Sequence, residues 1–319
     1  MIDYICGSFL IIQMVGKKIF GILFFLLITL NAHGYKRVLY VDNFSSIVGN
    51  TTSENKLLSF AKRYGFNCLL LYELNKVDKK YPLKDKSTNG ILAKFISKAK
   101  STYNIDEIGA IGEASEFFID VIHPYNESRN NVYEKFNVYN LEYEYWSKKA
   151  SGEDGYYCEN YLKYDNYQCT REGSFKHFID DLKAMKSLVS QKSYKIKIEA
   201  FLGWFKENEI REISKYSDRV ILQSYDKNPR LCYSKTKKRL SFVTSLSSKI
   251  ETSVLFSSTM ENMGKWLKYD TLDKTENIFM SEMKAKNSEL AKKLKIDSFG
   301  YHTYSYLEKS LSYYAYSQN

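Results

Sequence analysis

The chain has 319 residues, of which 44% are hydrophobic and 26% charged, so it can bury a large core and is not a disordered protein. Its 3 prolines and 15 glycines exclude collagen-like and proline-rich architectures. The net charge is +10, but lysines are interleaved with acids and form no RNP-like or zinc-finger pattern. We therefore expect a solvated basic surface and no nucleic-acid partner.

The first 34 residues have the features of a secretory signal peptide. Lys17 and Lys18 precede an apolar run at residues 19–30, and Ala32 and Gly34 supply small residues before a cleavage site after Gly34. The run is short for a membrane span of about 20 residues. Residues 1–13 read as an over-long start before Met14, and an uncleaved anchor over residues 9–30 is the alternative. We expect a mature protein of residues 35–319, secreted, periplasmic or at the cell surface, without a membrane span.

Export affects how the cysteines are interpreted, because disulfides persist in oxidising compartments. Cys158 and Cys169 lie in a stretch rich in Tyr, Asn and Asp, within a loop insertion at about 147–173, and we expect them to pair. Cys68 lies in an apolar run and is expected to be a buried hydrophobe. The sequence has no CxxC motif, and the histidines after residue 34 are far apart. We expect neither a metal site nor a cofactor.

Runs rich in β-branched and aromatic residues alternate with runs that have helical spacing. The predicted strands cover residues 37–43, 67–74, 107–112, 136–145, 194–202, 219–225, 252–257 and 298–304. The predicted helices cover residues 53–64, 89–103, 115–122, 174–190, 207–216, 274–294 and 307–314. This alternation predicts a single (β/α)₈ TIM barrel of the α/β class. A doubly wound open sheet is the competing fold, but no GxGxxG follows the first strand.

The fourth predicted strand carries a row of polar side chains. Alternate residues of a strand share a face, which places Asn140, Glu142 and Glu144 together. Two neighbouring buried glutamates cannot both ionise cheaply, so one pKa should rise. A carboxyl with a raised pKa can serve as a general acid towards a glycosidic oxygen. The alternative is an exposed strand on which both glutamates are inert.

Residues 137–144 (NVYNLEYE) resemble the DxxDxDxE strand of family 18 glycoside hydrolases, the chitinases and endo-β-N-acetylglucosaminidases. In this alignment Glu144 takes the general-acid position and Glu142 that of the preceding Asp, while Asn137 and Asn140 replace the two further acids. Three other strands add to the resemblance: residues 223–226 (QSYD) are similar to MxYD, residues 300–304 (GYHTY) to GxMxW, and residues 108–112 occupy the place of SxGG.

The resemblance implies an exported barrel that acts on glycans containing N-acetylglucosamine. Glu144 would be the acid/base, Glu142 and Tyr225 would orient the acetamido group, and Asp226 would support them. Substrate-binding positions carried over by the resemblance are Asn140, Gln223, Tyr225, Asp226 and Tyr304, the last as the stacking floor for the sugar. The expected partner is a carbohydrate and the expected state a monomer.

Two alternatives remain open. Asn140 cannot be an anion and Glu142 is one methylene longer than Asp, and relatives of this family that lose the acids are lectin-like binding proteins. The second reading is therefore a non-catalytic carbohydrate-binding barrel. A third is a two-carboxylate glycosidase that pairs Glu144 with Glu261.

Overall fold

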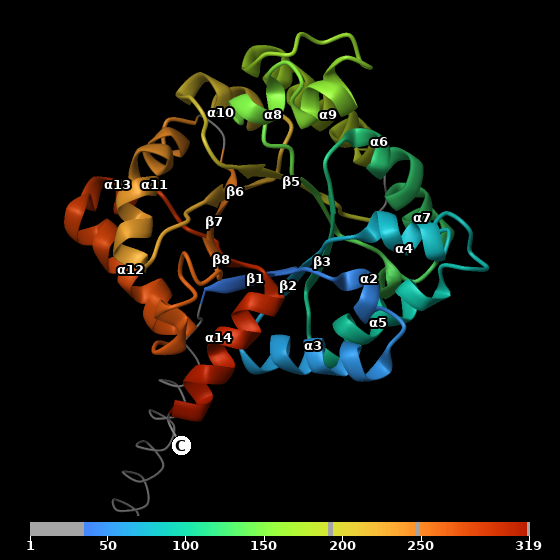
Figure 1. Ribbon diagram of the computed structural model, residues 1–319, viewed down its shortest axis with the longest axis horizontal. Helices are drawn as coiled ribbons and strands as arrows, with labels where there is room; N and C mark the ends of the chain where they lie inside the picture. The colour runs from blue at the N-terminus through green and yellow to red at the C-terminus, as the bar shows by residue number, and fades with distance from the viewer. Residues whose placement is uncertain (1–34, 191–193, 247–248, 318–319) are drawn as a thin grey trace, which may run out of the picture. The chain divides into compact units, whose positions relative to one another are not determined.

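A computed structural model describes residues 35–190, 194–246 and 249–317. Eight parallel strands close into one barrel in chain order, with β8 paired to β1 (Figure 1). The strands are β1 (Lys36–Val41), β2 (Cys68–Leu71), β3 (Glu107–Gly112), β4 (Val138–Leu141), β5 (Lys197–Leu202), β6 (Arg219–Gln223), β7 (Glu251–Ser257) and β8 (Ser298–His302). The predicted (β/α)₈ fold is confirmed.

Helices surround the barrel (Figure 1). The α-helices are α2 (Phe44–Ile47), α3 (Thr51–Arg63), α4 (Leu74–Lys80), α5 (Gly90–Tyr103), α6 (Ser115–Phe117), α7 (His123–Ser128), α8 (Lys148–Ser151), α9 (Arg171–Val189), α10 (Glu207–Ile213), α11 (Pro229–Val243), α12 (Leu272–Lys286), α13 (Ser288–Lys293) and α14 (Tyr304–Ser317). Short π- and 3₁₀-helical turns are η1 (Phe118–Ile122), η2 (Val132–Glu134), η3 (Cys158–Leu162) and η4 (Trp266–Lys268). None of the helices in the described ranges is long and apolar enough to cross a membrane.

Alternation along the strands sorts side chains between the barrel interior and the helices. One buried cluster unites alternate residues from seven strands: Val38, Tyr40, Cys68, Leu70, Ile111, Val138, Phe201, Ile221 and Leu255. Residues in the same register include Asn140 of β4, Glu199 of β5 and Arg219 of β6, so a polar layer lies within the barrel as well. The interior is therefore packed, and the space for a ligand lies at its mouth.

Several predicted boundaries are wrong. β4 ends at Leu141 rather than at residue 145, and β2 ends at Leu71, because Glu73 takes a left-handed conformation (φ 60°) and α4 begins at Leu74. The single helix expected over 274–294 is two, because the side chain of Asn287 accepts the Leu290 amide and caps α13. Helix α11 was not expected. The predicted signal peptide lies outside the described residues.

Candidate functional site

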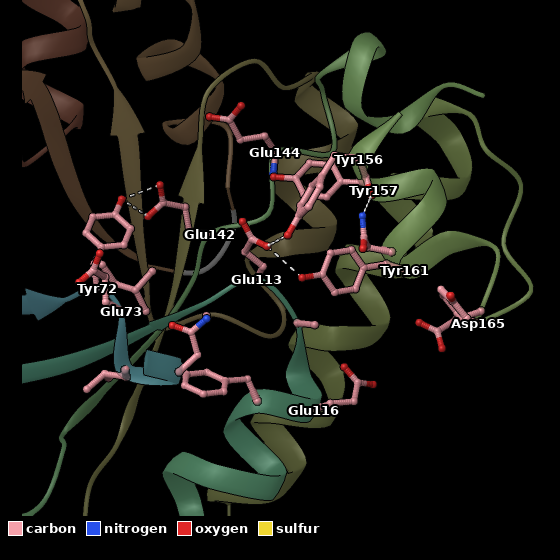
Figure 2. A pocket seen from close by; sticks show the side chains of 18 residues that line it. Tyr72, Glu73, Glu113, Glu116, Glu142, Glu144, Tyr156, Tyr157, Tyr161 and Asp165 are labelled. Atoms are coloured by element: carbon pink, nitrogen blue, oxygen red, sulfur yellow. Dashed lines mark hydrogen bonds between the residues drawn. The ribbon is translucent and has the colours of Figure 1, made fainter. Parts of the chain in front are cut away.

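A cavity of about 770 Å³ opens at the carboxyl ends of β2, β3 and β4, where barrels of this fold carry their chemistry (Figure 2). Residues directly after these strands form its inner side, and the chain between β4 and α9 forms its outer wall. The lining is polar and aromatic: Tyr72, Glu73, Leu74, Asn75, Ile111, Gly112, Glu113, Ala114, Glu116, Phe117, Glu142, Glu144, Tyr156, Tyr157, Asn160, Tyr161, Tyr164 and Asp165.

Glu142 is the first residue after β4, and its amide still pairs with the sheet by donating to the Gly112 carbonyl at 2.8 Å. The Tyr72 hydroxyl approaches its two carboxyl oxygens at 2.7 and 2.6 Å (Figure 2). Burial raises the pKa of Glu142 to about 8; the Tyr72 hydrogen bond opposes this, and the charges of Glu144 and Glu113 add to it. A carboxyl whose pKa is raised in this way keeps its proton to higher pH than an exposed glutamate, which is a property that general acids need.

Glu144 and Glu113 bring two more carboxyls to the same cavity. The amide of Glu144 donates to the Tyr157 hydroxyl at 3.0 Å, which ties the segment after β4 to the outer wall. Burial and the charge of Glu113 raise the pKa of Glu144. Glu113 follows β3 and accepts hydrogen bonds from the hydroxyls of Tyr156 and Tyr161, each at 2.9 Å (Figure 2). A third acid, Glu113, thus lines the cavity together with the two glutamates expected from the sequence.

The outer wall is the insertion predicted at about 147–173, and the predicted Cys158–Cys169 disulfide closes it. The wall also rests on α9, where His177 lies between Asp165 at 2.9 Å and Asp181 at 3.2 Å. These carboxylates outweigh the effect of burial and raise the pKa of His177. The ring of Tyr157 stacks on buried Tyr143 with centroids 4.1 Å apart. The wall is therefore held by a covalent bond, an ionic contact and stacking.

Four aromatic rings lie close together inside the barrel, near the end that carries the cavity. The ring of His302 lies 5.6 Å from Tyr40, 6.0 Å from Tyr72 and 5.9 Å from Tyr225, centroid to centroid. Burial raises the pKa of Tyr225, as do the charges of Glu142 and Glu144. Gln223 is the last residue of β6, two positions before Tyr225. Tyr225 thus lies close enough to Glu142 and Glu144 for their charges to affect its pKa, but neither Tyr225 nor Gln223, both predicted from the sequence, lines the cavity.

Three predicted substrate-binding residues are engaged elsewhere. Asn140 is buried and its amide donates to Glu199 at 2.5 Å. Asp226 forms an ion pair with Lys235 at 2.7 Å, beside α11. Tyr304 packs edge-on against Phe60 of α3 and bonds to Glu308, so it does not lie in the barrel mouth.

The placement of Tyr304 follows from the length of β8. The strand ends at His302, which therefore is the last inward-facing ring of β8, whereas Tyr304 already begins α14. Glu261, the partner considered for a two-carboxylate pair, is exposed in the loop after β7 and does not line the cavity.

Sequence reasoning missed Tyr72, Glu113 and the tyrosines of the wall. Two of these residues could have been predicted from the sequence. Tyr72 continues the inward alternation of Cys68 and Leu70, and Glu113 directly follows the last residue of β3. The tyrosines of the wall could not have been predicted, because an irregular insertion has no periodic pattern of side chains. Within the described ranges, no group of three or more His, Cys, Asp or Glu side chains is arranged to hold a metal ion.

No family model matches this sequence, and no curated protein matches it. Solved structures similar to the chain include a family 18 chitinase from Crocus vernus, at 13% identity and a TM-score of 0.47, covering 88% of this chain and 96% of that one. The YdjI aldolase from Escherichia coli K12 has 10% identity, a TM-score of 0.42 and coverages of 90% and 89%. Dihydrodipicolinate synthase from Agrobacterium tumefaciens has 7% identity, a TM-score of 0.43 and coverages of 89% and 77%. Such likeness concerns the fold alone, so function is argued from the site.

Proposed function

We propose that this protein is a glycoside hydrolase that acts on a hexosamine-containing glycan, with Glu142 as the proton donor. The observation that carries the proposal is the placement of Glu142, which Tyr72 holds in an open cavity that Glu144 also lines; burial there raises the pKa of Glu142 to about 8. Glycosidases place one protonated and one ionised carboxyl at the scissile bond. The sequence resemblance to family 18 supports the hexosamine, and the Cys158–Cys169 disulfide supports a site of action outside the reducing cytosol.

The proposed reaction needs only groups of this chain and water. Glu142 gives its proton to the glycosidic oxygen as the bond from the anomeric carbon breaks, and the bonding electron pair leaves with that oxygen. The carboxylate of Glu144 faces the positive charge that develops at the anomeric carbon. Water then adds its oxygen to that carbon, and its proton returns to Glu142. This assignment exchanges the roles that the resemblance gives to Glu142 and Glu144, because Glu142 is the one whose carboxyl lies against the Tyr72 hydroxyl and whose pKa burial raises to about 8.

The second candidate is a lectin-like barrel without turnover. One observation favours it: Asn140, which stands at an acid position of the family pattern, is buried and bonded to Glu199. Its amide is thus not directed at a ligand. The tyrosine-rich cavity suits sugar binding in either case, because aromatic rings present apolar faces and polar tips.

The test is release of reducing ends from hexosamine oligosaccharides by the mature protein and its variants. Glu142→Gln should lower kcat by about 10²-fold or more while the oligosaccharide still binds, because only the proton donor is lost. Glu261→Gln, an exposed acid outside the cavity, serves as the matched control and should keep the wild-type rate. If Glu144→Gln abolishes turnover and Glu142→Gln does not, the roles are those of the family pattern. Sugar binding without any wild-type turnover would establish the lectin-like alternative.

A further inference from the structure

The lining of the cavity is acidic in a protein that is basic overall. The side chains of Glu73, Glu113, Glu116, Glu142, Glu144 and Asp165 line it, and none of the described lining residues is Lys, Arg or His. The whole chain, in contrast, has 47 Lys and Arg against 37 Asp and Glu. A concave wall of one sign concentrates its field inside the cavity, so this wall attracts cations and repels anions.

The acids at the centre of this lining have no cationic partner among the described residues. Among the described residues, Glu113, Glu142 and Glu144 form no ion pair. The carboxyl of Glu142 accepts from Tyr72 and that of Glu113 from two tyrosines of the wall, whereas the bond between Glu144 and Tyr157 uses the backbone amide of Glu144. Other acids of the chain behave differently: Glu73 at the rim pairs with Lys76 at 2.6 Å, and Asp226 outside the cavity pairs with Lys235 at 2.7 Å. Glu113 therefore remains available to a positively charged group of a ligand, whereas Glu142 is the proton donor of the proposed reaction.

The side chains around Glu113 indicate which kind of cationic ligand group the cavity would bind. The hydroxyls of Tyr156 and Tyr161 both donate to Oε2 of Glu113, so two tyrosines of the wall hold this carboxylate at the edge of the cavity (Figure 2). Glu113 can form an ionic contact with an organic ammonium group, and the tyrosine rings that line the same cavity offer it aromatic surface, which attracts cations. The described side chains contain no cluster suited to a metal ion, and a cavity of about 770 Å³ has room for sugar rings.

We propose that the cavity binds a glycan whose amino groups are free rather than acetylated, and that Glu113, Tyr156 and Tyr161 form the subsite for a protonated sugar amine. This inference deepens the proposed function and names its substrate class. The placement of Asp226 agrees with it: the residue expected to support recognition of an acetamido group is paired with Lys235 outside the cavity. An acetamido group is neutral and would leave the charge of Glu113 without a counter-ion.

The test compares two probes that differ only in acetylation: a β-1,4 glucosamine tetramer and the N-acetylglucosamine tetramer. Affinity is measured by titration calorimetry at pH 6 in low salt, on the Glu142→Gln variant so that no probe is consumed. We expect the glucosamine tetramer to bind at least about tenfold more tightly, which corresponds to about 1.4 kcal/mol. Adding Glu113→Gln should remove this preference and its salt dependence, whereas adding Glu261→Gln should change neither.

The second variant, Tyr156→Phe with Tyr161→Phe, removes the hydroxyls that hold Glu113 and should lower the affinity for the glucosamine tetramer several-fold, even if Glu113→Gln fails to fold. Tighter or equal binding of the acetylated tetramer would overturn the inference and leave the hydrolase proposal intact. Equally tight binding of spermidine would overturn the assignment to a sugar. Preference for the free amine in a protein that hydrolyses neither tetramer would support the inference and refute the proposed hydrolysis.

Discussion

Two glutamates in the same barrel show how the surroundings of a carboxyl decide its state. Glu107 lies at the start of β3, where Arg219 and Lys197 each contact it within 2.8 Å; these cations outweigh burial and lower its pKa to about 2. Glu142 lies at the opposite end of the barrel without a cation, and burial raises its pKa to about 8. One carboxyl is thus fixed as a structural anion, and the other can exchange a proton near neutral pH.

The hydroxyl of Tyr72 affects the pKa of Glu142, and this effect can be tested by removing that one hydroxyl. The tyrosine stabilises the ionised carboxylate and so lowers the pKa of Glu142 against the effect of burial. The acid form is the active one, so turnover should be present below about pH 8 and lost as the pH rises through that value. Tyr72→Phe removes the opposing hydrogen bond and should move this alkaline limb of kcat to higher pH. The measurement is a pH–rate profile of both proteins.

Tyr164→Phe is the matched control, because Tyr164 lines the same cavity but is 77% exposed and should leave the limb unmoved. A limb that moves to lower pH in Tyr72→Phe would contradict the role given to the hydroxyl. An unchanged limb would show that the titrating group is not Glu142.

At the level of elements, the wall between β4 and α9 determines the shape of the site. It supplies Tyr156, Tyr157, Asn160, Tyr161, Tyr164 and Asp165 to the cavity. The wall has only the short helical turns α8 and η3 of its own, so its position depends on the disulfide and on contacts with α9. Loops carried by a rigid barrel are where this fold varies its specificity.

Replacing both cysteines of the wall should therefore affect binding more than the chemical step. In Cys158→Ser with Cys169→Ser, the apparent KM for the glycan should rise about tenfold or more with a smaller change in kcat, because Tyr161 and Tyr157 lose their fixed place beside Glu113 and Glu144. The free energy of unfolding should fall by about 2–4 kcal/mol, as for other native disulfides. Steady-state kinetics and urea unfolding measure the two effects. Cys232→Ser replaces a buried free thiol outside the cavity and is the control for the kinetics. An equal rise in KM in the Cys232→Ser variant would refute the proposal that the wall positions residues for glycan binding.

Some residues of the site can be predicted from the sequence and others cannot. The order of the strands and the inward register of Asn140 and Glu142 follow from hydrophobic alternation, which the closed barrel preserves. Alternation stops predicting direction where a strand ends, which is why Tyr304 was expected in the barrel mouth but lies against Phe60. The contacts of Glu113 with Tyr156 and Tyr161 join residues more than 40 positions apart, through a loop without periodicity.

At the level of the whole molecule, an ionic layer inside the barrel ties four strands together at the end opposite the cavity. Arg219 of β6 contacts Glu199 of β5 and Glu107 of β3, and Lys197 of β5 contacts Glu107 and Glu251 of β7. Glu199 has no exposed surface and Arg219 is 3% exposed. Charges this deeply buried are tolerated only as a set, because each one alone would carry a large desolvation cost.

Removing Arg219 should therefore destabilise the barrel far more than removing an arginine on its surface. In Arg219→Leu, Glu199 stays buried with only the Asn140 amide as a hydrogen-bond donor, and the free energy of unfolding should fall by about 3–5 kcal/mol. Arg211→Leu removes an arginine from α10 whose pair with Glu207 at 2.6 Å is half exposed, and should cost about 1 kcal/mol or less. Urea unfolding of both variants at pH 7 measures the difference. Adding Glu199→Leu to Arg219→Leu should recover much of the loss, because the unpaired anion is then gone. Equal destabilisation by the two arginine variants would show that the interior pair is no more important to the barrel than a surface contact.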